Sequence, residues 1–148
     1  MTTNDLLACI APCGLVCHTC VASAGGVMKQ PAQQLLHFLE GFDVYADKLS
    51  AFDPRLKKFR DFAEVLGLIA QAECQGCRDG VCKFPGCGIA PCAKDRGHDF
   101  CYQCPQFPCD KADFEPLLKA KWLKAGERMK AIGPEAYFEE VSGRSHYG

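Results

Sequence analysis

The chain has 148 residues, of which 48% are apolar, so it is long enough for one domain or for two small halves that share a hydrophobic core. Its formal net charge is −1 at pH 7, and if its 12 cysteines bound three Zn²⁺ ions as thiolates, the charge would change by −12 + 6 = −6, to about −7. A chain this acidic is a poor match for a phosphate backbone, so nucleic acid is not expected as a partner.

The N-terminal residues MTTNDLLACIAPCG lack the basic start and the long apolar run of an export signal. No stretch of the sequence approaches the roughly eighteen apolar residues of a membrane span. We therefore expect a cytoplasmic protein with no membrane contact. Because thiols stay reduced in the cytosol, metal binding is favoured over a disulfide scaffold.

The first group of cysteines ends in Cys13, Cys17 and Cys20, which have the CxxxCxxC spacing of the iron–sulfur cluster in radical enzymes. Those enzymes build a barrel from βαβ units, for which this chain is too short and lacks the pattern. The CHTC step also resembles a redox dithiol, but Pro12 and Gly14 interrupt the strand that such a site needs before it. We interpret the three cysteines as metal ligands.

Three thiols leave a tetrahedral zinc ion one ligand short. Cys9 could complete the set, although a continuous helix would hold it about 12 Å from Cys17. A thiol from residues 74–109 is at least as plausible, and it would tie the two cysteine groups together. Since Cys9 lies in the apolar run LLACIA, a buried free thiol is the favoured interpretation.

Residues 31–72 are predicted to be helical, with apolar residues at helical spacing that we interpret as core. Pro31 suits a first helical turn, and Asp53 can cap a second helix that begins with Pro54. The two expected stripes are Leu35, Phe38, Leu39 and Phe42, and then Leu56, Phe59, Ala63, Leu66 and Ala70.

Residues 74–109 contain eight cysteines and nine glycines or prolines. This composition predicts neither a helix nor a long strand, and turns this polar cannot fold by hydrophobic burial alone. The order of the segment is therefore expected to come from bound metal. It holds eight of the candidate ligands: Cys74, Cys77, Cys82, Cys87, Cys92, Cys101, Cys104 and Cys109.

The steps CQGC and CYQC, at residues 74–77 and 101–104, resemble the two halves of a ribbon-like structural site. The other four cysteines of the segment could supply a second site, and the connectivity is open. His98 could replace a thiol, but a solvated loop histidine is the favoured interpretation.

Residues 111–142 are predicted to form two further helices. Asp113 and Pro116 can open the first, and Gly133-Pro134 ends it before a short helix over residues 135–141. Its apolar stripe is Leu118, Trp122, Ala125, Met129 and Ile132.

The order of the motifs resembles a bacterial and archaeal cysteine-rich family of unknown function that is associated with zinc. The matching segments are IAPCGLVCHTC at 10–20, CQGC at 74–77 and PCAKDRGHDFCYQCPQFPC at 91–109. The resemblance implies a mixed helical fold around clustered metal-ligand cysteines. It supports most of the candidate ligands, fits Cys82 and Cys87 less well, and places Cys9 outside the family pattern.

Taken together, the sequence predicts a mainly α fold: one domain over 1–148 that wraps round a loop-dominated, metal-binding core with little strand. Residues 10–20 and 74–109 form the core, and 31–72 and 111–142 the helical parts. We expect two or three structural zinc–thiolate sites in a module that binds another protein, with no catalytic residues assigned. The alternative is an iron–sulfur or dithiol redox protein. The candidate ligands are Cys13, Cys17, Cys20, Cys74, Cys77, Cys82, Cys87, Cys92, Cys101, Cys104 and Cys109.

Overall fold

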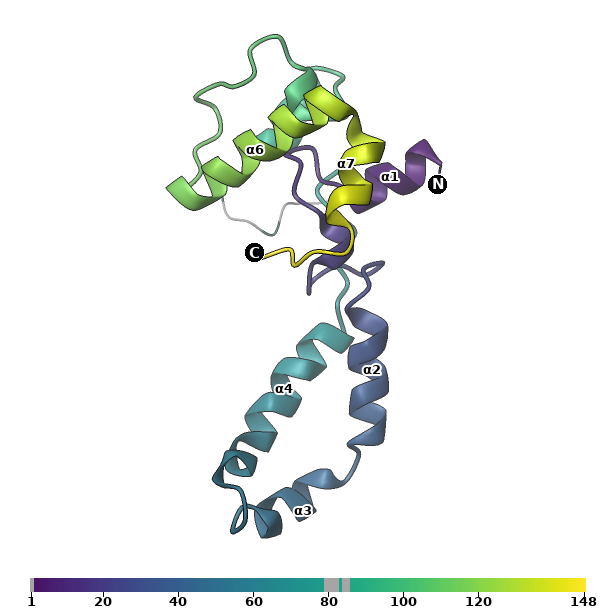
Figure 1. The fold of residues 1–148 in the computed structure, drawn as a ribbon, viewed down its shortest axis with the longest axis vertical. Coiled ribbons are helices and arrows are strands. Elements are labelled where there is room, and N and C mark those ends of the chain that lie inside the picture. The colour runs from purple at the N-terminus through teal and green to yellow at the C-terminus, as the bar shows by residue number, and fades with distance from the viewer. Residues whose placement is uncertain (1, 79–82, 84–85) are drawn as a thin grey trace.

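The computed structural model describes residues 2–78, 83 and 86–148. In these residues the chain is mainly helical, with isolated β-bridges and no sheet, so the predicted mainly α fold with little strand is confirmed. Figure 1 shows two parts joined by a narrow waist: a head that contains both termini, and an arm of three α-helices that projects from it. We use "arm" for residues 27–73 and "head" for the rest of the described chain.

The head begins with helix α1, Thr3–Cys9, which the sequence analysis did not predict. Thr2 and Asp5 form a capping box: the Thr2 amide donates to Asp5 Oδ2 (2.8 Å), and the Asp5 amide donates to Thr2 Oγ1 (3.2 Å). The helix buries Leu6, and the next turn of chain buries Ile10. Both side chains join a core cluster with Met129 of a later helix.

The arm contains α2 (Lys29–Phe38), α3 (Phe42–Leu49), the 3₁₀ turn η2 (Pro54–Lys58) and α4 (Phe59–Ala70). Helices α2 and α4 pack side by side (Figure 1). Asp53 caps η2 as predicted, accepting a hydrogen bond from the Arg55 amide (3.0 Å). The predicted helix over residues 31–42 is split, because Gly41 has a φ of +76°.

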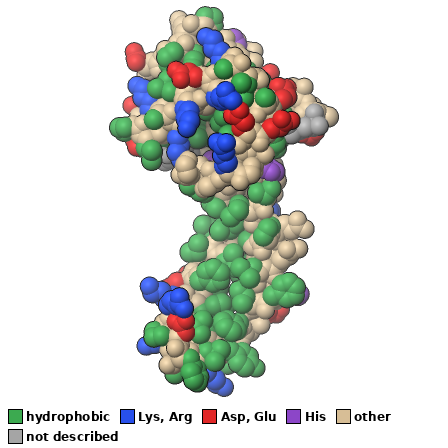
Figure 2. Space-filling model, viewed as in Figure 1, with side chains coloured by type: hydrophobic (Ala, Val, Ile, Leu, Met, Phe, Trp, Pro, Cys, Tyr) green, Lys and Arg blue, Asp and Glu red, His purple; other side chains and the backbone are tan. Residues whose placement is uncertain are grey.

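The predicted apolar stripes of the arm are only partly core, which corrects the interpretation made from the sequence. Ala32, Leu66 and Ala70 are buried where α2 meets α4. However, Leu35 is 42% exposed and Phe38 is 82% exposed. Figure 2 shows hydrophobic side chains covering the visible face of the arm. The arm has too few layers to bury both sides of its helices.

The cysteine-rich segment contains helix α5 (Ile89–Asp95) and the 3₁₀ turn η3 (Cys101–Gln103). The expectation that residues 74–109 hold no helix is therefore wrong. Pro91 lies in the first turn of α5, where a missing N–H costs no intrahelical hydrogen bond, and Gly97 (φ +68°) follows its end. Pro91 and Gly97 thus lie at the two ends of the helix, and neither interrupts its centre.

The head is completed by α6 (Pro116–Ile132) and α7 (Pro134–Val141), which meet at Gly133 as predicted. Glu115, and not Asp113, caps α6 by accepting hydrogen bonds from two amides of the first turn. The predicted stripe of α6 is core, with Trp122, Ala125 and Met129 buried. Among the described residues, no helix combines the length and the apolar character that crossing a bilayer requires.

Candidate metal centres

Four of the predicted ligands line one small cavity in the head, which we call the thiol cavity: Cys92, Cys101, Cys104 and Cys109. Its volume is about 20 Å³, which is room for one ion or one water molecule. Cys92 comes from α5, Cys101 begins η3, Cys104 caps the end of η3, and Cys109 follows in the next loop. The sequence analysis paired residues 101–104 with 74–77, whereas the structure brings them to Cys92 and Cys109.

Backbone hydrogen bonds hold the loop that carries these thiols. The Cys101 amide donates to the Pro12 carbonyl (2.8 Å), which joins the loop to the first cysteine group. The Cys104 amide donates to the Cys101 carbonyl (3.1 Å), and the Phe107 amide donates to the Cys104 carbonyl (2.9 Å). The Phe107 ring then packs edge-on against Trp122, with the ring centroids 5.1 Å apart. The cavity is thus supported by the core of the head.

Burial raises the pKa of the Cys101 thiol, and the Trp122 side chain offsets part of this effect. Negative charge on Cys109, Cys92 or Cys104 raises it further, so each of these three sulfurs lies near Cys101. Trp122 is fully buried, and its Nε1 has no hydrogen-bond partner among the described residues. The Trp122 side chain is thus near enough to Cys101 to lower its pKa, although the indole N–H makes no hydrogen bond to a described residue.

Cys104 receives a hydrogen bond from a cation. Arg96 Nη1 lies 3.3 Å from Cys104 Sγ, and Arg96 lines the cavity together with Lys111. This guanidinium places a positive charge beside the sulfur. Neither Trp122 nor Arg96 was singled out from the sequence. The Arg in CAKDR, four residues after Cys92, was a usable signal because cations are common neighbours of thiolates.

A second set of thiols lies where the two cysteine-rich segments meet, and we call it the N-terminal thiol group: Cys17, Cys20 and Cys74. Cys17 begins the 3₁₀ turn η1 (Cys17–Thr19), and Cys20 caps its end. The Cys74 amide donates to the Ala22 carbonyl (3.0 Å), and the Ala24 amide donates to the Cys74 carbonyl (3.0 Å). These bonds bring a thiol of residues 74–109 to the first group, as the sequence analysis considered.

Burial raises the pKa of Cys17 to about 11, and the charges of Cys20 and Cys74 contribute to the rise. Arg78 acts in the opposite direction. Its guanidinium donates to the carbonyls of Leu7 (3.0 Å), Ile10 (3.1 Å) and Asp99, and lies 4.9 Å from the centre of the Phe100 ring. Arg78 therefore joins three segments of the head and supplies positive charge beside the thiols.

The remaining candidate ligands belong to neither set of thiols. Cys13 is buried in a core cluster with Trp122, and Cys77 and Cys87 pack against that cluster. Cys82 falls outside the described residues. Cys9 Sγ lies 4.0 Å from His18 Nδ1, and its charge contributes to the raised pKa of Cys17. His98, expected to be a solvated loop residue, is half-buried and lines the thiol cavity.

The side chains do not adopt a finished ligand geometry. Within residues 2–78, 83 and 86–148, no three His, Cys, Asp or Glu side chains are arranged closely enough to hold a metal ion. The thiol cavity and the N-terminal thiol group thus bring sulfurs together without ligating geometry. Coordination would require rotation of the cysteine side chains, which are short and lie on turns.

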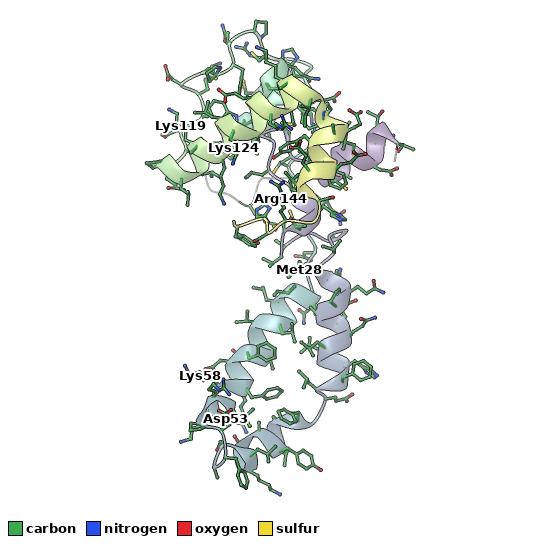
Figure 3. All side chains as sticks on the ribbon, viewed as in Figure 1. Met28, Asp53, Lys58, Lys119, Lys124 and Arg144 are labelled. Atoms are coloured by element: carbon green, nitrogen blue, oxygen red, sulfur yellow. The ribbon has the colours of Figure 1, made fainter. Side chains whose placement is uncertain are left out.

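A larger cleft, of about 710 Å³, lies between α6, α7 and the C-terminal residues. Lys121, Lys124, Arg128 and Arg144 line it, and Figure 3 labels Lys124 and Arg144 on the head. Part of this positive charge is neutralised, because Arg128 forms an ion pair with Glu140, which also lines the cleft. The described residues that line the cleft include no cysteine.

The motifs that suggested a family are matched by a family model over residues 9–114, the greater part of the chain. The matched residues include Cys9 and all of the candidate ligands. No curated protein and no solved structure matches the chain. The chain belongs to the family described as protein of unknown function, DUF3795.

Proposed function

We propose that the protein is a cytoplasmic zinc-binding protein whose zinc–thiolate sites are structural, and that its arm binds another protein. One observation carries the zinc proposal. Four cysteines surround a cavity with room for a single ion, and two N–H donors, from Trp122 and Arg96, are directed at their sulfurs. Zinc, when bound, would supply the positive charge that four closely spaced thiolates need, and the two N–H groups would donate to those thiolates.

The donor chemistry supports this assignment. A buried indole N–H without a partner costs about 1–3 kcal/mol, and a thiolate is a stronger acceptor for it than a thiol. A set of four sulfurs is typical of structural zinc sites. The cation of Arg96 would offset part of the net −2 charge of a zinc ion bound by four thiolates. The Trp122 N–H and the Arg96 guanidinium would each gain an interaction if the sulfurs were ionised.

The cysteines of the thiol cavity and of the N-terminal thiol group would cross-link segments of the head when they bind zinc. Cys92 holds α5, Cys101 and Cys104 hold η3, and Cys109 holds the loop that leads to α6. Zinc, when bound, would supply coordinate bonds between these segments and so contribute to the free energy of folding. We propose Cys17, Cys20 and Cys74 for a second ion, with Cys9 as a candidate for the fourth ligand, because its charge also contributes to the raised pKa of Cys17.

The electrostatics argue against the redox alternative. A catalytic dithiol needs a cysteine with a lowered pKa, because the thiolate is the nucleophile. Burial instead raises the pKa of Cys17 to about 11. The first cysteine of the CHTC step would therefore be a weak nucleophile near neutral pH. Metal binding can still ionise it, since zinc displaces the proton from a coordinating thiol.

The test is elemental mass spectrometry on the protein purified without oxygen, together with its absorption spectrum. We expect two equivalents of zinc per chain and no visible absorption, because Zn²⁺ is d¹⁰. Replacement by Co²⁺ should give the visible bands of tetrahedral sulfur coordination. Stoichiometric iron with a brown colour would overturn the zinc assignment in favour of an iron–sulfur protein.

Cysteine variants separate the two sites. We expect Cys104→Ser and Cys20→Ser each to lose about one equivalent of zinc, and the double variant to lose both. Cys87→Ser is the matched control, because Cys87 packs against the core and does not line the thiol cavity. If Cys104→Ser kept the full zinc content, the thiol cavity would not be the metal site.

A further inference from the structure

The exposed apolar surface of the molecule is concentrated on the arm. Among the described residues, thirteen large hydrophobic side chains are exposed, and eleven of them belong to residues 27–68. The other two, Leu117 and Tyr147, lie in the head. Scattered exposed hydrophobic residues are normal for a soluble protein, but a contiguous apolar patch usually marks an interaction site.

Six of these side chains form one face, which we call the arm face: Met28, Leu35, Phe38, Phe62, Val65 and Leu68. Met28 precedes α2 as its N-cap, and residues 35 and 38 follow seven and ten positions later, so the three lie towards one side of the helix. On α4, residues 62, 65 and 68 are three positions apart and likewise share one side. Figure 2 shows a continuous hydrophobic surface along both helices, and Figure 3 places Met28 at the end nearest the head.

The arm cannot bury this face by itself. Where α2 meets α4, only three side chains are buried: Ala32, Leu66 and Ala70. Polar contacts close the base of the hairpin, where Lys29 Nζ donates to the Ala72 carbonyl (2.8 Å) and Gln33 Nε2 donates to the Ala70 carbonyl (3.0 Å). Two helices with so small a common core are marginal alone, since helical stability comes mainly from tertiary packing.

The area of the exposed residues is sufficient for a stable dimer. Phe38 is 82% exposed, Leu68 is 73% exposed, and Val65 is 59% exposed. At the exposed fractions of its six side chains, the arm face presents on the order of 600 Å² of apolar surface per chain. A standard protein interface buries about 800 Å² per partner, of which somewhat more than half is apolar.

The charges of the arm favour a protein partner over a lipid surface. Residues 27–73 contain six Lys or Arg and seven Asp or Glu, so the arm is nearly neutral. A helix that lies on a membrane is usually rich in Lys and Arg on its polar face. When two copies of the same surface pair, a net charge on that surface repels its copy. The nearly balanced charges of the arm avoid this repulsion and are compatible with pairing of two chains.

We propose that the arm face pairs with the arm face of a second copy, so that two α2–α4 hairpins form a four-helix arrangement about a two-fold axis. This proposal deepens the interaction role proposed above and does not depend on zinc binding. The head would remain outside the interface. Burial of Phe38 and Leu68 between the two arms would complete the core that each arm lacks.

The test is sedimentation equilibrium of the full-length, zinc-loaded chain, in a reductant that excludes intermolecular disulfides. We expect twice the chain mass, with a dissociation constant in the micromolar range or tighter. Leu68→Lys and Val65→Asp place a charge in the arm face and should each weaken the dimer at least about tenfold. Both side chains are exposed in the single chain, so neither change should unfold it.

Leu117→Lys is the matched control, because Leu117 is 66% exposed but lies on α6 of the head. This variant should dimerise like the unchanged protein. The proposal is overturned if the unchanged chain is monomeric at tens of micromolar, or if its dimer survives both arm variants. Monomers that bind vesicles of anionic phospholipid would also overturn it. A dimer without zinc would refute only the zinc proposal, and a zinc-loaded monomer would refute only the pairing of arms.

Discussion

Tyr137 illustrates how a single polar group joins the C-terminal helices to the cysteine-rich N-terminus. Its hydroxyl donates to the Gly14 carbonyl over 3.1 Å, and both residues are buried. Burial raises the pKa of Tyr137, and the charges of Cys13 and Glu140 raise it further. The fold therefore favours the neutral phenol, which is the form that donates the hydrogen bond.

We predict that Tyr137→Phe lowers the free energy of unfolding by about 1–3 kcal/mol near neutral pH, because the Gly14 carbonyl is left buried without its partner. The pKa of Tyr137 is raised on folding, so its contribution is complete below the unfolded pKa of about 10 and is lost as pH rises through the folded value. Denaturant unfolding between pH 7.5 and 11 should therefore show the two proteins converging at high pH.

The control for this prediction is Tyr45→Phe, because Tyr45 is exposed on the arm. It should change neither the stability nor its dependence on pH. The prediction is contradicted if the difference in the free energy of unfolding between Tyr137→Phe and the unchanged protein stays constant across the alkaline range. The stability would then not depend on the proton of the Tyr137 hydroxyl.

At the scale of elements, Gly126 lets the loop of the thiol cavity approach α6. A Cβ atom at this position would overlap the ring of Phe107. Phe107 lies between Cys104 and Cys109 and packs against Trp122. The glycine in the middle of α6 is therefore a packing requirement, although glycine in a helix interior normally costs about 1 kcal/mol relative to alanine.

We predict that Gly126→Ala destabilises the protein by about 1–3 kcal/mol, because the overlap outweighs the gain in helix propensity. Gly67→Ala is the matched control: Gly67 lies inside α4, and a Cβ there meets no atom within 4 Å. It should stabilise by about 0.5–1 kcal/mol. Thermal unfolding of the unchanged protein and the two variants measures the direction of each change in stability. If both variants changed the melting temperature equally and in the same direction, the packing role of Phe107 would be contradicted.

The helices were predictable where a stripe and its end signals agreed. In α6, Trp122, Ala125 and Met129 are buried at the expected spacing, and Gly133 ends the helix. Helix α5 was missed because Pro91 was treated as a helix breaker, although the first turn tolerates proline. Burial was less predictable: the arm stripe containing Phe38 has helical spacing, but spacing cannot tell which side of a helix another element covers.

The candidate site was predictable in composition but not in grouping. Close spacing of cysteines indicated the residues, and short steps such as 101–104 did remain together. The partner of each step depends on where distant segments meet, as when the backbone of Cys74 pairs with Ala22 and Ala24. Trp122 could not be assigned for the same reason, because α6 meets the cysteine-rich loop only in the tertiary fold, whereas Arg96 lies close to Cys92 in the sequence and could have been found.

At the scale of the whole molecule, the head and the arm differ in what holds them together. The head contains all of the cysteines that the structure describes, and its core clusters draw on α1, the cysteine-rich loops, α6 and α7. The arm contains no cysteine and has its own small cluster around Ala32 and Leu66. Removal of metal should therefore act first on the head, where coordination would contribute to folding.

We predict that a chelator abolishes amide protection in residues 10–20 and 86–109, while α2 and α4 keep theirs. The reason is that metal would hold the cysteine-rich segments of the head together, whereas the arm contains no cysteine and packs α2 against α4 around its own cluster. Hydrogen exchange of the full chain, measured with zinc and with chelator, checks the prediction. Unchanged protection of the loops would show that they fold without metal. Loss of protection in α2 and α4 together with the loops would show instead that residues 1–148 unfold as one cooperative domain, because arm stability would then depend on the metal-bound head.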